Sequence, residues 1–300
     1  MISVVLVTYQ SHGVLEPCVE HLASCTSAHR MELIVIDNAS AEPSWEKTKR
    51  ILSSYESRFQ SIKVQRLAEN RGYAHANNRG AELAAGEFLL LLNPDVFVEP
   101  ETVQRSLSVL QQRDDLGAVG CRLELPNGSL DKACRRSLPT LWNSFTRFTR
   151  LAHVFPKSPW FAGYNLTHLP DRGSYAVGCL CGAFLLMQRD LYQNVGGLDE
   201  DYFMYGEDIA LCQRIQDFGY LLWYEGTANA VHLKGGNGGK KSSQSLKAFY
   251  EAMDIYYRKT HPNSILGAWI VKFATRLLCQ VHVRKSNSTI GVPAEERLAQ

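Results

Sequence analysis

The stretch that decides the fold is Leu89–Asp95, which reads Leu-Leu-Leu-Leu-Asn-Pro-Asp and follows Phe88. A short apolar run bounded by Gly86 and a proline is typical of a strand buried on both faces, at the centre of a parallel sheet. Such a strand places the carboxylate of Asp95 just past its C-terminal end, where ligands bind in open α/β sheets. A carboxylate there can hold a divalent cation, and the cation can hold a diphosphate. The alternative is that Asn-Pro-Asp only turns the chain and caps a helix that starts near Glu101.

Apolar runs alternate with helical spacing through the first third of the chain. We expect strands at Ile2–Val7, Leu33–Ile36, Ile62–Leu67 and Phe88–Leu92, and helices at Val14–Cys25, 43–58, Gly72–Ala85 and Thr102–Gln112. This alternation indicates βαβ units and a parallel sheet. The strand ends would then bring Thr8, Asp37, Asn70 and Asp95 to one edge.

The pattern is less regular in the rest of the chain. We expect strands at Gly117–Leu123, Gly178–Met187 and Leu221–Tyr224. Residues 124–173 read as loop, with one amphipathic helix around Leu141–Phe155, and further helices are expected at Glu207–Phe218, Ser245–Arg258 and Ile265–Val283. A length of 300 residues suits one large domain or two small ones.

Composition and cysteine usage indicate a globular protein in a reducing compartment. A hydrophobic content of 45% is ordinary for a globular protein with a full core, and the net charge of +2 says little about partners. We expect no nucleic-acid partner. The eight cysteines are scattered without zinc-type spacing, so buried free thiols are expected. No signal peptide precedes the strand at Ile2, and no apolar run approaches the ~20 residues of a spanning helix. We therefore predict a cytoplasmic location.

Four further segments carry polar groups that could bind a ligand. They are Val4–Tyr9, Asp37–Ser40, Glu69–Asn78 and Tyr205–Asp208. A carboxylate beyond a strand can accept from the N–H of a pyrimidine, and a Gly- and Ala-rich helix start lets a phosphate approach closely. Each segment also has a structural interpretation. Turns and helix caps account for Asp37–Ser40 and for Glu207–Asp208, and tight packing on the sheet accounts for Glu69–Asn78.

In this order and spacing, the segments resemble inverting glycosyltransferases of family 2 with the GT-A fold, and in particular their rhamnosyltransferase-like branch. The resemblance covers about residues 2–235. It implies an α/β fold with a Rossmann-like mixed sheet flanked by helices, followed by a C-terminal helical extension. The implied glycosyltransferase domain is 1–235, with a nucleotide-sugar-binding half at 1–95 and an acceptor and catalytic half at 96–235. Residues 236–300 would form a loop and C-terminal helices.

The resemblance also implies a role for each matching residue. Donor-binding positions are Thr8, Tyr9, Asp37 and Asn38 for the nucleoside, and Asn70, Gly72, Ala74, Asn78, Asn93, Asp95, Gly182 and Ala183 for the ribose, diphosphate or sugar. Asp208 matches the general base, with Glu207 as the next candidate. Asp95 matches the last acid of the metal motif, and His232 lies where related enzymes supply a further ligand for Mg²⁺ or Mn²⁺. An ordinary surface or packed histidine is an equal alternative for His232.

One residue departs from the family pattern. Asn93 stands where the motif usually has its first acid, so the site has one negative charge fewer and the need for metal is open. The expected reaction is inverting transfer of a deoxyhexose, such as rhamnose, from a dTDP- or UDP-linked donor to a hydroxyl of a glycan or lipid-linked acceptor, in cell-surface polysaccharide synthesis. A non-catalytic nucleotide-sugar-binding subunit is the alternative that Asn93 favours. A nucleotidyltransferase is less compatible, because Thr8–Gly13 supplies no glycine-rich phosphate loop.

Two basic, aromatic stretches stand outside these motifs. Residues 132–170 and 255–293 each hold six Lys or Arg and no acid. Helical spacing of aromatic residues with basic neighbours suits an anionic membrane or an acceptor that carries phosphate. The alternatives are helices packed on the core or a dimer interface. The glycine-rich stretch 235–239 could be a lid over the site or a slack linker.

Overall fold

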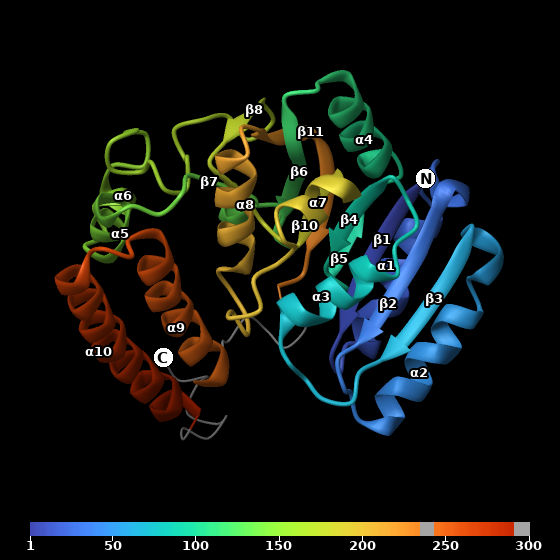
Figure 1. Ribbon diagram of the computed structural model, residues 1–300, viewed down its shortest axis with the longest axis horizontal. Helices are drawn as coiled ribbons and strands as arrows, with labels where there is room; N and C mark the ends of the chain where they lie inside the picture. Colours follow the sequence, from blue (N-terminus) through green and yellow to red (C-terminus); the bar gives the residue numbers. More distant parts are fainter. Residues whose placement is uncertain (235–242, 291–300) are drawn as a thin grey trace.

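The N-terminal half of the computed structural model is built around the predicted leucine strand (Figure 1). The model describes residues 1–234 and 243–290, with side chains up to Val283, so the stretch 235–239 lies outside the described residues. The strands are β1 (Ile2–Thr8), β2 (Met31–Asp37), β3 (Ser61–Arg66) and β4 (Phe88–Leu92), and the helices are α1 (His12–Ala23), α2 (Glu42–Ser53) and α3 (Tyr73–Glu82). Short 3-10 turns follow α1 at Ala28–Arg30 and α2 at Glu56–Arg58. The strands pair in parallel in the order β3-β2-β1-β4, and β4 is buried along its whole length.

The second half extends this unit into a mixed sheet. Its strands are β5 (Val96–Val98), β6 (Leu116–Glu124), β8 (Ser174–Val177), β10 (Phe184–Gln188) and β11 (Leu221–His232). Among the described residues nine strands form one sheet, which continues from β4 through β10, β6 and β11 to β5, with β8 paired to β11. β10 runs antiparallel to β4 and β6, which makes the sheet mixed. β11 pairs with β5 so that His232 lies opposite Val96, one residue beyond Asp95.

Two strand predictions need correction. Gly178–Met187 is not one strand, because β9 (Cys179–Leu180) pairs with β7 (Arg135–Arg136) in a separate two-stranded sheet and β10 begins only at Phe184. The strand expected at Leu221–Tyr224 continues to His232, across a register shift between Glu225 and Asn229. That irregularity interrupts the alternation of side chains, so the sequence pattern ends before the strand does.

Helices cover the sheet and form the C-terminal end of the molecule (Figure 1). They are α4 (Thr102–Gln112), α5 (Leu141–Phe148), α6 (Leu151–Val154), α7 (Arg189–Asn194), α8 (Glu207–Asp217), α9 (Ser243–Thr260) and α10 (Ile265–Ile290), with a 3-10 turn at Lys132–Cys134. The single helix expected around Leu141–Phe155 is divided at Arg150, whose backbone is left-handed with φ +64°. Helices α9 and α10 pack together at the end of the molecule opposite β3. Within the described residues, no helix combines the length and the apolar character needed to span a bilayer. The predicted α/β architecture with a mixed sheet and a C-terminal helical extension is confirmed.

Candidate active site

The ends of β1 and β2 form a buried polar floor at the sheet edge. Thr8 and Asp37 are register partners, and Thr8 Oγ1 donates a hydrogen bond to Asp37 Oδ1 at 3.2 Å. The other carboxylate oxygen, Asp37 Oδ2, accepts from the Ser40 amide at 2.9 Å and lies 3.7 Å from Arg66 Nε. Tyr9 follows directly and is half exposed. The carboxylate is thus fixed in place, and the residue after Thr8 carries an exposed aromatic side chain.

Hydrogen bonds between Asn38 and the segment Asn70–Gly72 fix the start of α3 beside this floor. Asn38 Nδ2 donates to Asn70 Oδ1 at 2.8 Å and to the Gly72 carbonyl oxygen at 3.1 Å, and the Gly72 amide donates to Asn70 Oδ1 at 3.0 Å. Gly72 has φ +97°, and a Cβ there would overlap the backbone of Phe203. Asn38 Oδ1 is buried and has no hydrogen-bond partner among the described residues. This orphaned oxygen is an acceptor left for a bound ligand or water.

The two remaining predicted positions on α3 face the protein rather than the sheet edge. Ala74 is completely buried. Asn78 Nδ2 donates to the Leu198 carbonyl at 2.8 Å and to Glu200 Oε1 at 3.0 Å, and Asn78 Oδ1 accepts from Tyr192 and from the Leu198 amide. The amide of Asn78 is therefore fully used in holding the turn at 196–200. Its contact with a donor stays a prediction.

Asp95 and His232 come together where β5 pairs with the end of β11. His232 Nε2 lies 3.5 Å from Asp95 Oδ1, and both side chains are largely buried. The second ring nitrogen, His232 Nδ1, lies 2.9 Å from Asp131 Oδ2. Asp131 is completely buried and also accepts from Lys234 Nζ at 2.6 Å and from the Ala133 amide at 3.0 Å. A carboxylate that fixes one nitrogen of a histidine is the usual support for a metal-binding imidazole.

Charges around His232 shift two pKa values in opposite directions. Burial opposes ionisation of Asp131, but hydrogen bonds from His232 and Lys234 outweigh it and lower the Asp131 pKa to about 2. Burial also opposes protonation of His232, but the carboxylates of Asp131 and Asp95 outweigh it and raise the His232 pKa to about 9. The pair of acids therefore attracts a positive charge to this imidazole. A proton or a divalent cation can supply that charge.

The protein groups near Asp95 fit a cation whose coordination shell is completed by a bound phosphate and water. Within the described residues, no group of three or more His, Cys, Asp or Glu side chains has the arrangement of a metal site. Asp95 and His232 are two suitable groups, and Asn93 adds a buried Oδ1 that lacks a partner among the described residues. Mg²⁺ in particular is often bound by one or two protein groups, with phosphate oxygens and water completing its shell.

The start of α8 carries the second half of the site. Asp208 Oδ2 accepts from Arg136 Nη2 at 2.7 Å and from the Gly182 amide at 3.3 Å, while Asp208 Oδ1 accepts from the Ile209 amide at 2.8 Å. The Gly182 carbonyl accepts from the Tyr73 hydroxyl at 2.9 Å. These contacts aim the Asp208 carboxylate at the turn before β10.

That turn joins the two halves of the site. The Ala183 carbonyl accepts from the Asn93 amide at 3.0 Å, next to the Gly182 contact with Asp208. Two adjacent residues thus connect the Asp95 segment with the carboxylate on α8. That Gly182 and Ala183 line the donor sugar and the acceptor, as the resemblance implies, stays a prediction.

Glu207 differs from its neighbour in its surroundings. It is buried, and its Oε2 has no hydrogen-bond partner among the described residues. Burial raises the pKa of Glu207, and the nearby Asp208 carboxylate raises it further. Asp208 instead accepts three hydrogen bonds, one from a guanidinium. Both carboxylate oxygens of Asp208 thus have hydrogen-bond donors, whereas Glu207 Oε2 has none among the described residues.

Comparison with protein families identifies the chain. Residues 3–196 match the model described as glycosyl transferase family 2. The chain belongs to this family. It is 28% identical over 272 residues to the N-acetylglucosaminyl-diphospho-decaprenol L-rhamnosyltransferase of Mycobacterium tuberculosis, covering 87% of this chain and 85% of that protein. It is 26% identical over 171 residues to the rhamnosyltransferase WbbL of Escherichia coli K12, covering 54% of this chain and 60% of that protein.

Solved structures support the GT-A fold of this family 2 glycosyltransferase. The mannosyltransferase PcManGT of Pyrobaculum calidifontis, in complex with GDP-Man and Mn²⁺, matches with a TM-score of 0.61 at 16% identity, covering 99% of this chain and 78% of that one. TarS 1–349 of S. aureus in complex with UDP matches with a TM-score of 0.56 at 16% identity, covering 99% and 76%. The predicted family, its fold and its membership among glycosyltransferases are confirmed.

Sequence reasoning missed three residues that contact the candidate site. Arg136, Asp131 and Tyr73 contact Asp208, His232 and Gly182 respectively. Arg136 and Asp131 lie in or beside the stretch that was noted only for its basic charge. Their partners are 72 and 101 residues away, so no local signal marks them. Side chains alternate between the two faces of a strand, so Arg135 and Arg136 of β7 point to opposite sides. This alternation is the one local signal that separates their roles.

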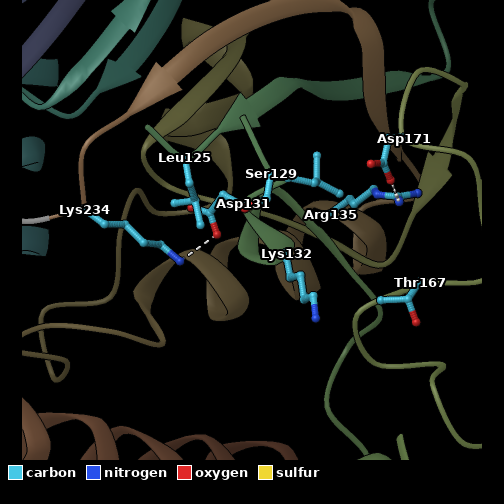
Figure 2. A pocket seen from close by; sticks show the side chains of 9 residues that line it. Leu125, Ser129, Asp131, Lys132, Arg135, Thr167, Asp171 and Lys234 are labelled. Atoms are coloured by element: carbon cyan, nitrogen blue, oxygen red, sulfur yellow. Dashed lines mark hydrogen bonds and ion pairs between the residues drawn. The ribbon is translucent and has the colours of Figure 1, made fainter. Parts of the chain in front are cut away.

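A cavity of about 500 Å³ adjoins the Asp131 side of this site. Figure 2 shows the residues of its wall, with Lys234 paired to Asp131 at one side and Arg135 paired to Asp171 at the other. Lys132 lies between these pairs. Thr8 and Asp37 do not line this cavity, so it is separate from the predicted nucleoside position. Its two ion pairs neutralise most of the charge on its wall.

Proposed function

We propose that this family 2 enzyme transfers a deoxyhexose, such as rhamnose, from a dTDP- or UDP-linked donor to a hydroxyl of a lipid-linked glycan, with inversion. The observation that carries the proposal is the turn at Gly182–Ala183, which contacts both Asp208 and the Asn93–Asp95 segment. In this proposal the leaving-group site and the carboxylate base lie at the two ends of this short turn. We place the transferase domain at residues 1–235, and the helices α9 and α10 in the extension that follows it.

The choice of sugar and acceptor is supported by the relatives. The mycobacterial protein is named for L-rhamnosyl transfer to an N-acetylglucosaminyl-diphospho-lipid, and WbbL is named a rhamnosyltransferase. At 28% and 26% identity these names support a substrate class for this chain, and not an individual compound. Synthesis of a cell-surface polysaccharide on the inner face of the membrane is the matching role.

The nucleoside binds at the polar floor. Asp37 accepts a hydrogen bond from the base, and Thr8 holds the carboxylate in position. Tyr9 stacks on the base from the exposed side. The unpartnered Asn38 Oδ1 accepts from the ribose or diphosphate side of the donor, close to the helix start that Gly72 opens.

The diphosphate lies by Asp95 and His232. These two residues would hold Mg²⁺ or Mn²⁺, and Asn93 would bind either the cation or the ribose. When bound, the cation supplies positive charge that stabilises the diphosphate as the glycosidic bond breaks. Asp131 keeps the His232 ring oriented through Nδ1, so that Nε2 points at the cation site.

Asp208 removes the proton of the acceptor hydroxyl. The hydroxyl attacks the anomeric carbon from the face opposite to the diphosphate, so a single displacement inverts that centre. Arg136 and the Gly182 amide orient the carboxylate. Glu207, whose pKa is raised by burial, stays protonated over more of the pH range and serves structure.

A ligand panel tests this proposal. In thermal-shift measurements, dTDP-rhamnose with Mg²⁺ is expected to stabilise the protein most, by about 2.7 kcal/mol at a concentration one hundred times the dissociation constant. Chelator should remove most of the effect, and dTDP alone should retain part of it. The donor assignment would be contradicted if GDP-sugars stabilised the protein while dTDP- and UDP-sugars did not.

A non-catalytic nucleotide-sugar-binding subunit is the second candidate, and Asn93 in place of an acid favours it. Such a protein would show the same thermal shift without turnover. Release of nucleoside diphosphate from the bound donor, measured with and without cation, separates the two functions. The intact Asp208–Arg136 arrangement supports the enzyme.

A further inference from the structure

Helix α10 turns its most apolar side to solvent. Its inner side packs on α9, where Thr275 is buried and the His282 ring stacks on Tyr250 with 5.9 Å between ring centroids. The outer side carries large apolar residues that are each 42–75% exposed: Ile265, Leu266, Trp269, Ile270, Phe273, Leu277 and Val281. Their spacing of three and four residues places them on one helix face. A contiguous apolar face of this kind marks a contact surface.

A second exposed apolar group lies on α5 and α6 and the loop that follows. Trp142, Phe145, Phe155 and Trp160 are each 44–74% exposed. Trp142 stacks on Phe145, and its Nε1 donates to the Trp160 carbonyl at 2.9 Å, so the rings form an ordered cluster. Helices α5, α6 and α10 occupy the same end of the long axis of the molecule (Figure 1). Aromatic rings with satisfied polar atoms suit a membrane–water interface.

The charges beside both groups have one sign. Lys272 and Arg276, four residues apart, flank the apolar face of α10, and Arg147, Arg150 and Lys157 accompany the aromatic cluster. None of these five cations forms a salt bridge within the part of the chain that the structure describes. Cations next to exposed apolar side chains are the combination that anionic lipid headgroups attract.

We propose that the outer face of α10 and the α5–α6 aromatic cluster together dock the protein on an anionic lipid bilayer. The apolar rings enter the boundary between headgroups and acyl chains, and the five cations contact the headgroup phosphates. A second copy of the chain fits less well, because it would set like charges against one another. The proposal deepens the proposed function by placing the enzyme where a lipid-linked acceptor is found. It rests on surface chemistry alone, so vesicle binding and donor turnover can fail independently.

Sedimentation of the full chain with vesicles tests the docking. Vesicles with phosphatidylglycerol should bind the protein at low salt, and binding should weaken as salt rises, because screening reduces surface attraction. Vesicles of phosphatidylcholine alone should bind much less. The double substitution Trp269→Ser with Phe273→Ser should weaken partitioning at least tenfold. The double substitution Lys272→Gln with Arg276→Gln should weaken it about fivefold for each charge removed.

A matched control uses another exposed aromatic residue. Phe218, at the end of α8, is 56% exposed and lies outside both groups, so Phe218→Ser should leave vesicle binding unchanged. All variants should keep the melting temperature, since the replaced side chains make few internal contacts. The proposal is overturned if the unmodified protein ignores anionic vesicles at low salt, or if Trp269→Ser with Phe273→Ser binds them normally. It is also overturned if light scattering shows a lipid-free dimer that this double substitution dissociates without changing vesicle binding.

Discussion

Replacing Asp208 by Asn removes the proposed base while nearly keeping the shape of the side chain. The amide Oδ1 can still accept from the Ile209 amide, which lies 2.8 Å from the native oxygen. The new NH₂ group, however, faces the Arg136 guanidinium and the Gly182 amide, which are both donors. Loss of a positioned base typically lowers the rate 10²–10⁴-fold. We therefore expect kcat to fall by about that factor, equivalent to about 2.7–5.5 kcal/mol in activation free energy.

The same substitution has a separate cost in stability. Asp208 and Arg136 side chains are each 12% exposed, so the guanidinium is left nearly buried without its counter-charge. Breaking a buried pair costs about 3–5 kcal/mol, and the retained shape and partial exposure make the lower end the expected value. The nucleoside floor at Thr8 and Asp37 belongs to other strands, so donor affinity should persist. The assay therefore measures kcat, donor affinity by calorimetry and melting temperature on the same preparation.

Two outcomes would refute the assignment of Asp208. Turnover within threefold of the unmodified enzyme, in a folded variant that binds donor, would show that another group takes the proton. If Glu207→Gln loses the rate and Asp208→Asn does not, the role of base moves to Glu207. Arg136→Lys serves as the control for orientation, because it keeps the charge and loses the planar donor geometry. We expect it to lower kcat with little change in the donor dissociation constant.

Three further predictions concern the rest of the site. Asp95→Ala should weaken donor binding in the presence of Mg²⁺, and chelator should have the same effect on the unmodified protein, which titration calorimetry measures; unchanged donor affinity in chelator would indicate a metal-independent site. Burial raises the pKa of Glu207 above its unfolded value, so its contribution to stability is present below the unfolded pKa and is lost as pH rises through the folded pKa. Glu207→Gln should therefore stabilise the protein at pH 8 but not at pH 4, with about 1.4 kcal/mol for each pH unit between the two pKa values. Gly72→Ala should destabilise by at least about 1 kcal/mol, because its φ is +97° and a Cβ would meet the Phe203 backbone.

A control variant accompanies the measurement on Gly72. Gly13 lies in α1 with open space around the position of a Cβ, so Gly13→Ala should leave stability unchanged or raise it by up to about 1 kcal/mol. Equal destabilisation by both glycine substitutions would contradict the role given to the backbone of Gly72. For Glu207→Gln, a stability difference that is constant between pH 4 and pH 8 would contradict the raised pKa.

The sheet edge could be predicted because its signals are local. The leucine run of β4 and the β-branched run of β1 identify buried parallel strands, and the residue after each strand then lies at a known edge. Thr8, Asp37 and Asp95 follow from that rule alone. Helices with clear periodicity, such as α4, were also predicted with correct bounds.

The rest depends on contacts between distant segments. Asp131 belongs to the site only because β11 continues past its irregular stretch and brings His232 to it. Arg136 reaches Asp208 only because β7 pairs with β9. Asn78 likewise has distant partners, because its amide holds the turn at 196–200, while the donor contact that the family pattern implies stays a prediction. Long-range pairing of short strands leaves no periodic trace in a single sequence.

The most direct test of the account is the product of one reaction. The full chain is incubated with Mg²⁺, dTDP-rhamnose and a short-chain lipid diphosphate that carries N-acetylglucosamine, and the isolated product is examined by nuclear magnetic resonance. The account predicts a new glycosidic bond to a sugar hydroxyl, with the anomeric configuration opposite to that of the donor, and no such product from Asp208→Asn. A product that retains the donor configuration, or one formed equally well by Asp208→Asn, would contradict it.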